Sequence, residues 1–198
     1  MRIIFYLIFL LYSTWSFSQL SSREWHKGIV VTTNQDTISG EIKYDFSSNM
    51  ITLIKNESVI AFSSHKLMYF EIYDESYKSY REFYAIPHRN ASNYLTPILF
   101  ELQFEGVLSL LSREKIVIET SSVGYGYGVP VISQPTVRYD FYFLTKGGKL
   151  TQFSGSKRDL LTILAKKKNE IQSFIKGNRL KTDDLRDLVR IIAFYNSI

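Results

Sequence analysis

Apolar and polar residues alternate in short runs along most of this chain, and that period of two limits its fold more than any other feature. The run from Ile38 to Phe46 is the clearest example. One face carries Ile38, Ile42, Tyr44 and Phe46, and the other carries Glu41, Lys43 and Asp45. Strict alternation predicts a strand that buries one face. Ile29–Thr33 precedes this run across a turn-prone Asn-Gln-Asp trio, so we expect a hairpin here.

Further runs of the same kind follow, separated by short turns. They are Ile51–Lys55, Val59–Phe62, Leu67–Tyr73, Tyr80–Ile86, Ile98–Phe104, Val107–Ser112, Lys115–Glu119, Val137–Leu144 and Leu150–Phe153. Short strands joined by short turns predict an antiparallel sheet body. Alternation does not distinguish a sandwich from an open barrel, so both architectures stay open.

The pattern changes after residue 155. Ser156 and Asp159 have the spacing of a capping box, and apolar residues then recur at intervals of three and four, as in amphipathic helices. They are Leu160, Leu161, Ile163, Leu164, Ile171, Phe174, Ile175, Leu185, Leu188, Val189, Ile192 and Tyr195. These apolar stripes need a partner, and the sheet is the nearest. We expect an α+β protein in which the body, 19–155, and two to three helices in 156–198 form one structural unit.

The first residues have the pattern of a secretory signal peptide. One positive charge at Arg2 is followed by an uncharged, mostly apolar stretch from Ile3 to Tyr12 and by the small exit residues Ser16 and Ser18. This stretch is half the length of about 20 residues that a spanning helix needs. We therefore expect cleavage before Gln19, removal of residues 1–18, and export of a soluble chain without a transmembrane segment to the periplasm or the extracellular space.

The residue inventory excludes several kinds of chemistry. Cysteine is absent, so disulfides and thiolate metal sites are excluded. His26, His65 and His88 lack metal-ligand spacing, and we expect them on the surface. Glu101 and Glu105 are interpreted as solvent-facing carboxylates of one strand. No nucleophilic serine motif or dinucleotide loop occurs. We therefore predict no metal, no cofactor and no assignable catalytic residue.

Several short motifs together resemble a known group of proteins. They are a signal peptide ending in Ser-Gln, the hairpin from Gly28 to Ile42 with its Asp-Thr-Ile turn, Lys157–Leu161, and the closing stretch from Leu188 to Asn196. The chain resembles uncharacterised exported β-rich proteins of Bacteroidetes-type bacteria. The resemblance implies a compartment and a fold, and it implies no activity.

The most unusual stretch is a glycine-rich segment within residues 121–135. Gly124, Gly126 and Gly128 alternate there with Tyr125 and Tyr127. Tyrosine offers a stacking face and a hydroxyl group, so Tyr125 and Tyr127 are candidate ligand-binding residues. The alternative is a long hairpin connection whose glycine and proline residues limit aggregation.

Positive charge is concentrated near the carboxyl end. Residues 155–198 carry 10 Lys and Arg against 5 Asp and Glu, whereas residues 19–154 carry 13 against 14. A candidate basic surface consists of Arg158, Lys166, Lys167, Lys168 and Lys176. It could face an anionic surface, or it could simply be the solvated face of amphipathic helices. Nucleic acid is not expected as the partner of an exported chain.

Two functional hypotheses from different classes follow. The first is an exported, non-enzymatic binding or interaction domain of unknown ligand, for which an envelope glycan, a peptide or another envelope protein is a candidate partner. The alternative is a hydrolase that acts on envelope glycan or peptide polymers. A pocket lined by close acidic pairs would favour the hydrolase, whereas an open aromatic surface near Tyr125 would favour binding.

Overall fold

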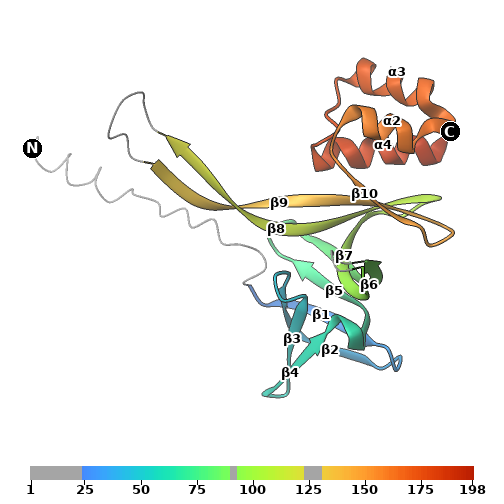
Figure 1. The fold of residues 1–198 in the computed structure, drawn as a ribbon. Helices are drawn as coiled ribbons and strands as arrows, with labels where there is room; N and C mark the ends of the chain where they lie inside the picture. Colours follow the sequence, from blue (N-terminus) through green and yellow to red (C-terminus); the bar gives the residue numbers. More distant parts are fainter. Residues whose placement is uncertain (1–23, 90–92, 123–130) are drawn as a thin grey trace, which may run out of the picture.

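The computed structural model describes residues 24–89, 93–122 and 131–198, and these form an α+β protein with an antiparallel sheet body and C-terminal helices (Figure 1). The strands are β1 (His26–Thr32), β2 (Thr37–Asp45), β3 (Met50–Lys55), β4 (Ser58–Ser63), β5 (Leu67–Asp74), β6 (Ser79–Arg89), β7 (Leu95–Phe104), β8 (Leu108–Ser122), β9 (Val131–Thr145) and β10 (Leu150–Phe153). The helices are α2 (Lys157–Ile163), α3 (Lys168–Asn178) and α4 (Leu185–Ser197), with short 3-10 turns η3 (Ser64–Lys66) and η4 (Ala165–Lys167). No helix among these residues is long and apolar enough to cross a membrane.

One continuous sheet contains all the described strands. Its order is β10-β9-β8-β7-β6-β5-β1-β2-β3-β4, so β1 lies between β2 and β5 while the other neighbours follow the sequence. The expected first hairpin is confirmed, with Val30 opposite Ile38. The structure merges two predicted strands: Leu108–Ser112 and Lys115–Glu119 belong to a single strand, β8, because Arg113 and Glu114 continue its pairing with β9.

Two glycines let the sheet curl at its amino-terminal end. Gly28 and Gly40 are directly paired across β1 and β2. A Cβ atom at Gly28 would lie 2.1 Å from the Glu71 carbonyl oxygen, and one at Gly40 would lie 2.3 Å from that of Ile54. The absence of side chains there permits this close backbone approach.

The curl brings the beginning of β3 close to the beginning of β7. The Asn49 side chain donates to Ser64 Oγ at 2.8 Å and accepts from the Leu99 amide at 2.8 Å, and Ser64 Oγ donates to the Pro97 carbonyl at 2.7 Å. Together these bonds hold β1–β7 in a form closer to an open barrel than to a sandwich (Figure 1).

The core has two principal parts. Inside the curl, Ile42, Phe70 and Phe83 belong to a buried cluster that β1–β7 supply. The second cluster lies between the helices and one face of β8–β10, and it contains Phe143, Leu160, Ile171, Leu188 and Ile192 among others. The apolar stripes of 156–198 therefore pack on the sheet.

The helix ends follow local capping rules. Ser156 caps α2 by accepting from the Asp159 amide at 3.2 Å, as its spacing predicts. The last helix begins at Leu185, because Asp184 is its N-cap and accepts from the Asp187 amide. Asn196 near the end of α4 binds the backbone of β8, with its Oδ1 and Nδ2 each 3.0 Å from the amide and carbonyl of Leu108.

Candidate functional site

A groove of about 660 Å³ lies between α4 and the part of the sheet made by β6, β7 and β9. We call it the Arg81 groove. Its wall on the sheet side consists of Tyr77, Ser79, Tyr80, Arg81, Glu101, Leu102, Gln103 and Tyr139, and its wall on the helix side consists of Asp184, Leu185, Arg186, Val189 and Arg190. Polar and aromatic side chains from distant parts of the chain therefore meet in one concave site, as ligand sites require.

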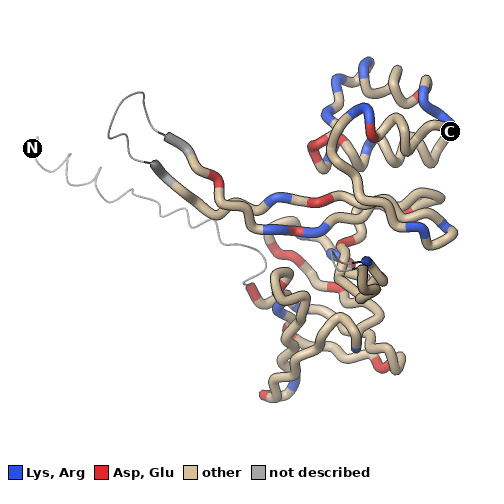
Figure 2. Tube along the Cα trace, viewed as in Figure 1, with Lys and Arg blue, Asp and Glu red and all other residues tan. Residues whose placement is uncertain are grey.

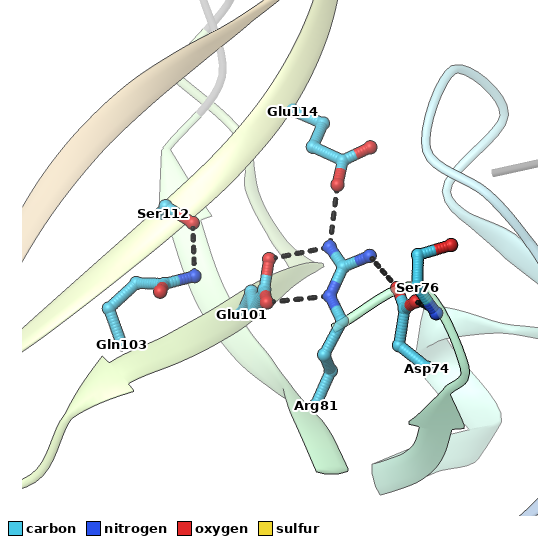
Figure 3. A network of polar contacts seen from close by, with 7 residues as sticks. All are labelled: Asp74, Ser76, Arg81, Glu101, Gln103, Ser112 and Glu114. Carbon is cyan, nitrogen blue, oxygen red and sulfur yellow. Dashed lines mark hydrogen bonds and ion pairs between the residues drawn. The ribbon is translucent and has the colours of Figure 1, made fainter. Parts of the chain in front are cut away.

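Arg81 is at the centre of a buried ionic network (Figure 3). Its Nε and Nη2 donate to the two carboxylate oxygens of Glu101 at 2.7 and 2.8 Å. Nη2 also donates to Glu114 at 2.6 Å, and Nη1 donates to Asp74 at 3.3 Å. Bidentate pairing of this kind fixes the plane of the guanidinium group.

Three carboxylates around one guanidinium leave an excess of negative charge at the base of the groove. The side chains of Asp74, Glu101 and Glu114 are only 1, 10 and 7% exposed. Burial raises the pKa of Glu114, and the nearby Arg81 offsets only part of that rise. Burial alone would lower the pKa of Arg81, but the bonds and charges of Glu101 and Glu114 outweigh it and raise this pKa.

Tyrosines stand at the mouth of the groove. Tyr77 and Tyr80 are 69 and 65% exposed, and Tyr139 is half-buried, with its pKa raised to about 12 by burial. The Tyr80 ring meets the edge of the Tyr73 ring at a centroid distance of 5.1 Å. Beyond Tyr80 lies a shallower hollow of about 470 Å³, lined also by Lys27, Gly28, Ile29, Glu71, Tyr73 and Glu75. Tyr80 thus belongs to two adjacent concave surfaces.

The residues singled out from the sequence lie elsewhere. Tyr125 and Tyr127, like the signal segment 1–18, lie outside the described residues, and their roles stay predictions. In the proposed basic surface, Arg158, Lys166, Lys168 and Lys176 are exposed. Figure 2 shows Lys and Arg positions distributed along the C-terminal helices. Lys167 differs from them, because its Nζ donates to the Tyr195 carbonyl at 3.0 Å and to that of Ile198.

Two expectations about titratable residues are wrong. Glu101 is buried against Arg81 instead of facing solvent, whereas Glu105 is exposed. His26 is buried in β1 with 6% exposure, so the histidines are not all on the surface. Sequence reasoning missed Arg81 and Glu114 entirely. For Arg81 a usable signal was present, since it shares one face of an alternating strand with the buried Phe83. Glu114 lay between two predicted strands and offered no such signal.

Neither a metal cluster nor a relative identifies the site. Within residues 24–89, 93–122 and 131–198, no three His, Asp or Glu side chains are grouped so that they could hold a metal ion. Comparisons with protein-family models, with curated proteins and with solved structures find no match to the chain.

Proposed function

We propose that this chain is an exported, non-enzymatic binding protein that holds an extended envelope glycan in the Arg81 groove. The observation that carries the proposal is the combination of exposed tyrosine rings with a rigid polar floor. Tyr77 and Tyr80 are exposed lining residues of the groove, and Arg81 and Glu101, which also line it, are locked to each other. Export rests on the amino-terminal pattern and on the resemblance to exported β-rich proteins.

The chemistry of these side chains suits a sugar. The apolar face of a pyranose ring packs on an aromatic face, and its hydroxyl groups both donate and accept hydrogen bonds. Glu101 and Gln103 offer acceptors, and Arg186 and Arg190 on α4 offer donors. Because Gln103 Nε2 is held by Ser112 Oγ at 2.9 Å and Glu101 by Arg81, little side-chain entropy remains to be lost on binding.

The position of Tyr80 favours a chain-like ligand. Tyr80 is a lining residue of both the Arg81 groove and the adjacent hollow beside Glu71 and Tyr73. A polymer that continues past Tyr80 would contact both surfaces, whereas a monosaccharide would fill only one. We therefore expect affinity to rise with the length of the oligosaccharide.

Calorimetry tests the proposal by measuring the affinity of the protein for a set of soluble envelope oligosaccharides. Chitotetraose is one member of this set. Tyr77→Ala and Tyr80→Ala should each weaken binding by up to about tenfold, because one aromatic contact contributes about 0.5–1.5 kcal/mol. Tyr94→Ala is the matched control, since Tyr94 is 73% exposed and does not line the groove. Unchanged affinity in both groove variants contradicts the proposal. Binding of a short peptide of the envelope polymer, with no binding of any glycan, contradicts it as well.

One observation favours hydrolysis as a second candidate. Glu101 and Glu114 accept from the same Arg81 nitrogen, so their carboxylates are close together, and the raised pKa of Glu114 suits a general acid. We rank this function second because Glu101 lines the groove and Glu114 does not. Release of new reducing ends from the same oligosaccharides, abolished in Glu101→Gln, would establish hydrolysis.

A further inference from the structure

The distal halves of β8 and β9 form a two-stranded arm with open edges. We define the β8–β9 arm as residues 113–122 with residues 131–140, which pair with each other throughout. Strand β7 pairs with β8 only as far as Ser112, and β10 pairs with β9 only from Phe141 onward. Among the described strands, nothing else pairs with this arm, which projects beyond the rest of the sheet (Figure 1). An isolated pair of strands is marginally stable, and its open edges can accept another strand.

The side chains of β8 in this arm are arranged symmetrically about Val117. Two isoleucines flank it, with Ile116 43% and Ile118 65% exposed on one face. On the other face, Lys115 lies two residues before Val117 and Glu119 two residues after it. Their side chains are 47 and 41% exposed. When residues 115–119 are read in the reverse direction, the three central residues keep the same apolar order, and the positive and negative ends exchange places.

We propose that β8 pairs with β8 of a second copy of this chain, antiparallel and around a two-fold axis at Val117. In this register Lys115 lies opposite Glu119 of the partner subunit, and Ile116 lies opposite Ile118 of the partner subunit. The contact is isologous, so each favourable pair occurs twice. Opposite charges and β-branched side chains in directly opposed positions stabilise antiparallel strands.

Pairs within each arm support the same register. Lys115 lies directly opposite Arg138 in the β8–β9 pairing, which is unfavourable for two cations. The two cations turn away from each other along the arm: Lys115 Nζ binds Asp140 at 2.6 Å, and Arg138 binds Glu119. In the dimer, the partner's Glu119 adds an anion beside Lys115. Arg138, Glu119, the partner's Lys115 and the partner's Asp140 then form a row of alternating charge across the strands.

Other open edges lack this self-complementarity. Strand β4 is uncharged from Ser58 to Ser63, so no charge selects a register there. The outer edge of β9 is interrupted at Phe141 by β10. Charged residues on an edge strand can also serve to prevent pairing, and an experiment on Lys115 and Glu119 separates that role from the proposed one.

Disulfide trapping tests the two-fold axis, because the chain contains no cysteine. Directly opposed Cα atoms in antiparallel strands lie about 4.5–5.5 Å apart, which suits a disulfide. Under mild oxidation, full-length exported Val117→Cys should form a covalent dimer rapidly. Ile60→Cys, on β4, is the control and should stay largely monomeric. Trapping through Ile60→Cys alone, or through neither variant, overturns the proposal.

A charge exchange tests the register. Sedimentation analysis should show a dimer whose affinity falls about tenfold or more in Lys115→Glu and in Glu119→Lys, since each places like charges opposite each other twice. The double variant should recover most of the affinity. Lys168→Glu controls for net charge, and thermal melts at dilute concentration confirm that each variant folds. A wild-type chain that stays monomeric, or single variants that associate more tightly, would instead identify Lys115 and Glu119 as edge protection.

Discussion

Two nitrogens of Arg81 donate hydrogen bonds to the carboxylate of Glu101, Nε to Oε1 at 2.7 Å and Nη2 to Oε2 at 2.8 Å. This fork joins β6 to β7 at the base of the groove. Asp74 from β5 and Glu114 from β8 complete the network, so a single guanidinium connects four successive strands. The candidate binding surface is therefore fixed to the sheet by the same residue that offsets part of the negative charge of its buried carboxylates.

Removing that guanidinium should destabilise the fold strongly. We predict that Arg81→Met lowers the free energy of unfolding by about 3–5 kcal/mol, because three buried carboxylates lose their counter-charge. Urea denaturation measures the change. Arg186→Met is the control, since Arg186 is an exposed residue of the same groove. A loss below about 1 kcal/mol for Arg81→Met would mean that hydration or protonation stabilises the carboxylates without the guanidinium.

The raised pKa of Glu114 gives stability a defined pH dependence. Above its ordinary pKa of 4.5, the folded protein holds the Glu114 proton more tightly than the unfolded chain does. The contribution of Glu114 to the free energy of unfolding therefore falls as pH rises from 4.5 through the higher folded-state pKa. Glu114→Gln removes this loss and keeps an acceptor for Arg81. Relative to wild type, the variant should gain stability as pH rises through that range, whereas Glu119→Gln should not. A stability difference between Glu114→Gln and wild type that does not change with pH would contradict the raised pKa of Glu114.

Asn196 should contribute to the docking of α4 on the sheet. Its Nδ2 donates to the carbonyls of Leu108 at 3.0 Å and Ile192 at 2.8 Å. Asn196→Asp exchanges this donor for an acceptor and should cost about 1–3 kcal/mol in chemical denaturation. Asn178→Asp is closely matched, because Asn178 also donates to the carbonyl four residues earlier but is exposed. Equal losses in the two variants would show that contact with β8 adds nothing.

The amino-terminal pattern predicts processing before Gln19. Expression of the full chain in a bacterium with an intact secretion system should yield exported protein without residues 1–18, as measured by intact mass. The Ser16-x-Ser18 exit provides the small side chains that cleavage requires. Exported protein that retains Met1 in a membrane fraction would contradict this prediction.

Local patterns predicted the elements of this fold well. Alternation placed Ile42, Tyr44 and Phe46 on a buried face, and all three are buried. Spacing alone identified the Ser156 cap. These features depend on residues a few positions apart, where backbone periodicity and capping chemistry act directly.

Alternation could place Arg81 on an interior face, but it could not predict which residues meet Arg81, because those contacts depend on the register between strands. Arg81 and Glu114 are 33 residues apart and meet only through the pairings of β6, β7 and β8. The β7–β8 pairing shifts between Leu102 and Phe104, and alternation does not predict such an irregularity. The two charged residues at 113 and 114 also led to the prediction of two separate strands. In the structure the strand continues through them, and Glu114 is an interior residue with Arg81 as its cationic partner.

An NMR titration of the Arg81 side chain tests the central proposal most directly. The Nε–H of Arg81 donates to Glu101 in the free protein, so its resonance reports any ligand that reaches the base of the groove. On addition of chitotetraose or a longer envelope oligosaccharide, we predict a saturable shift of this resonance together with those of Tyr80 and Gln103. Saturable shifts confined to Arg158, Lys166 and Lys168, or no shifts with any oligosaccharide, would contradict a glycan site in the Arg81 groove.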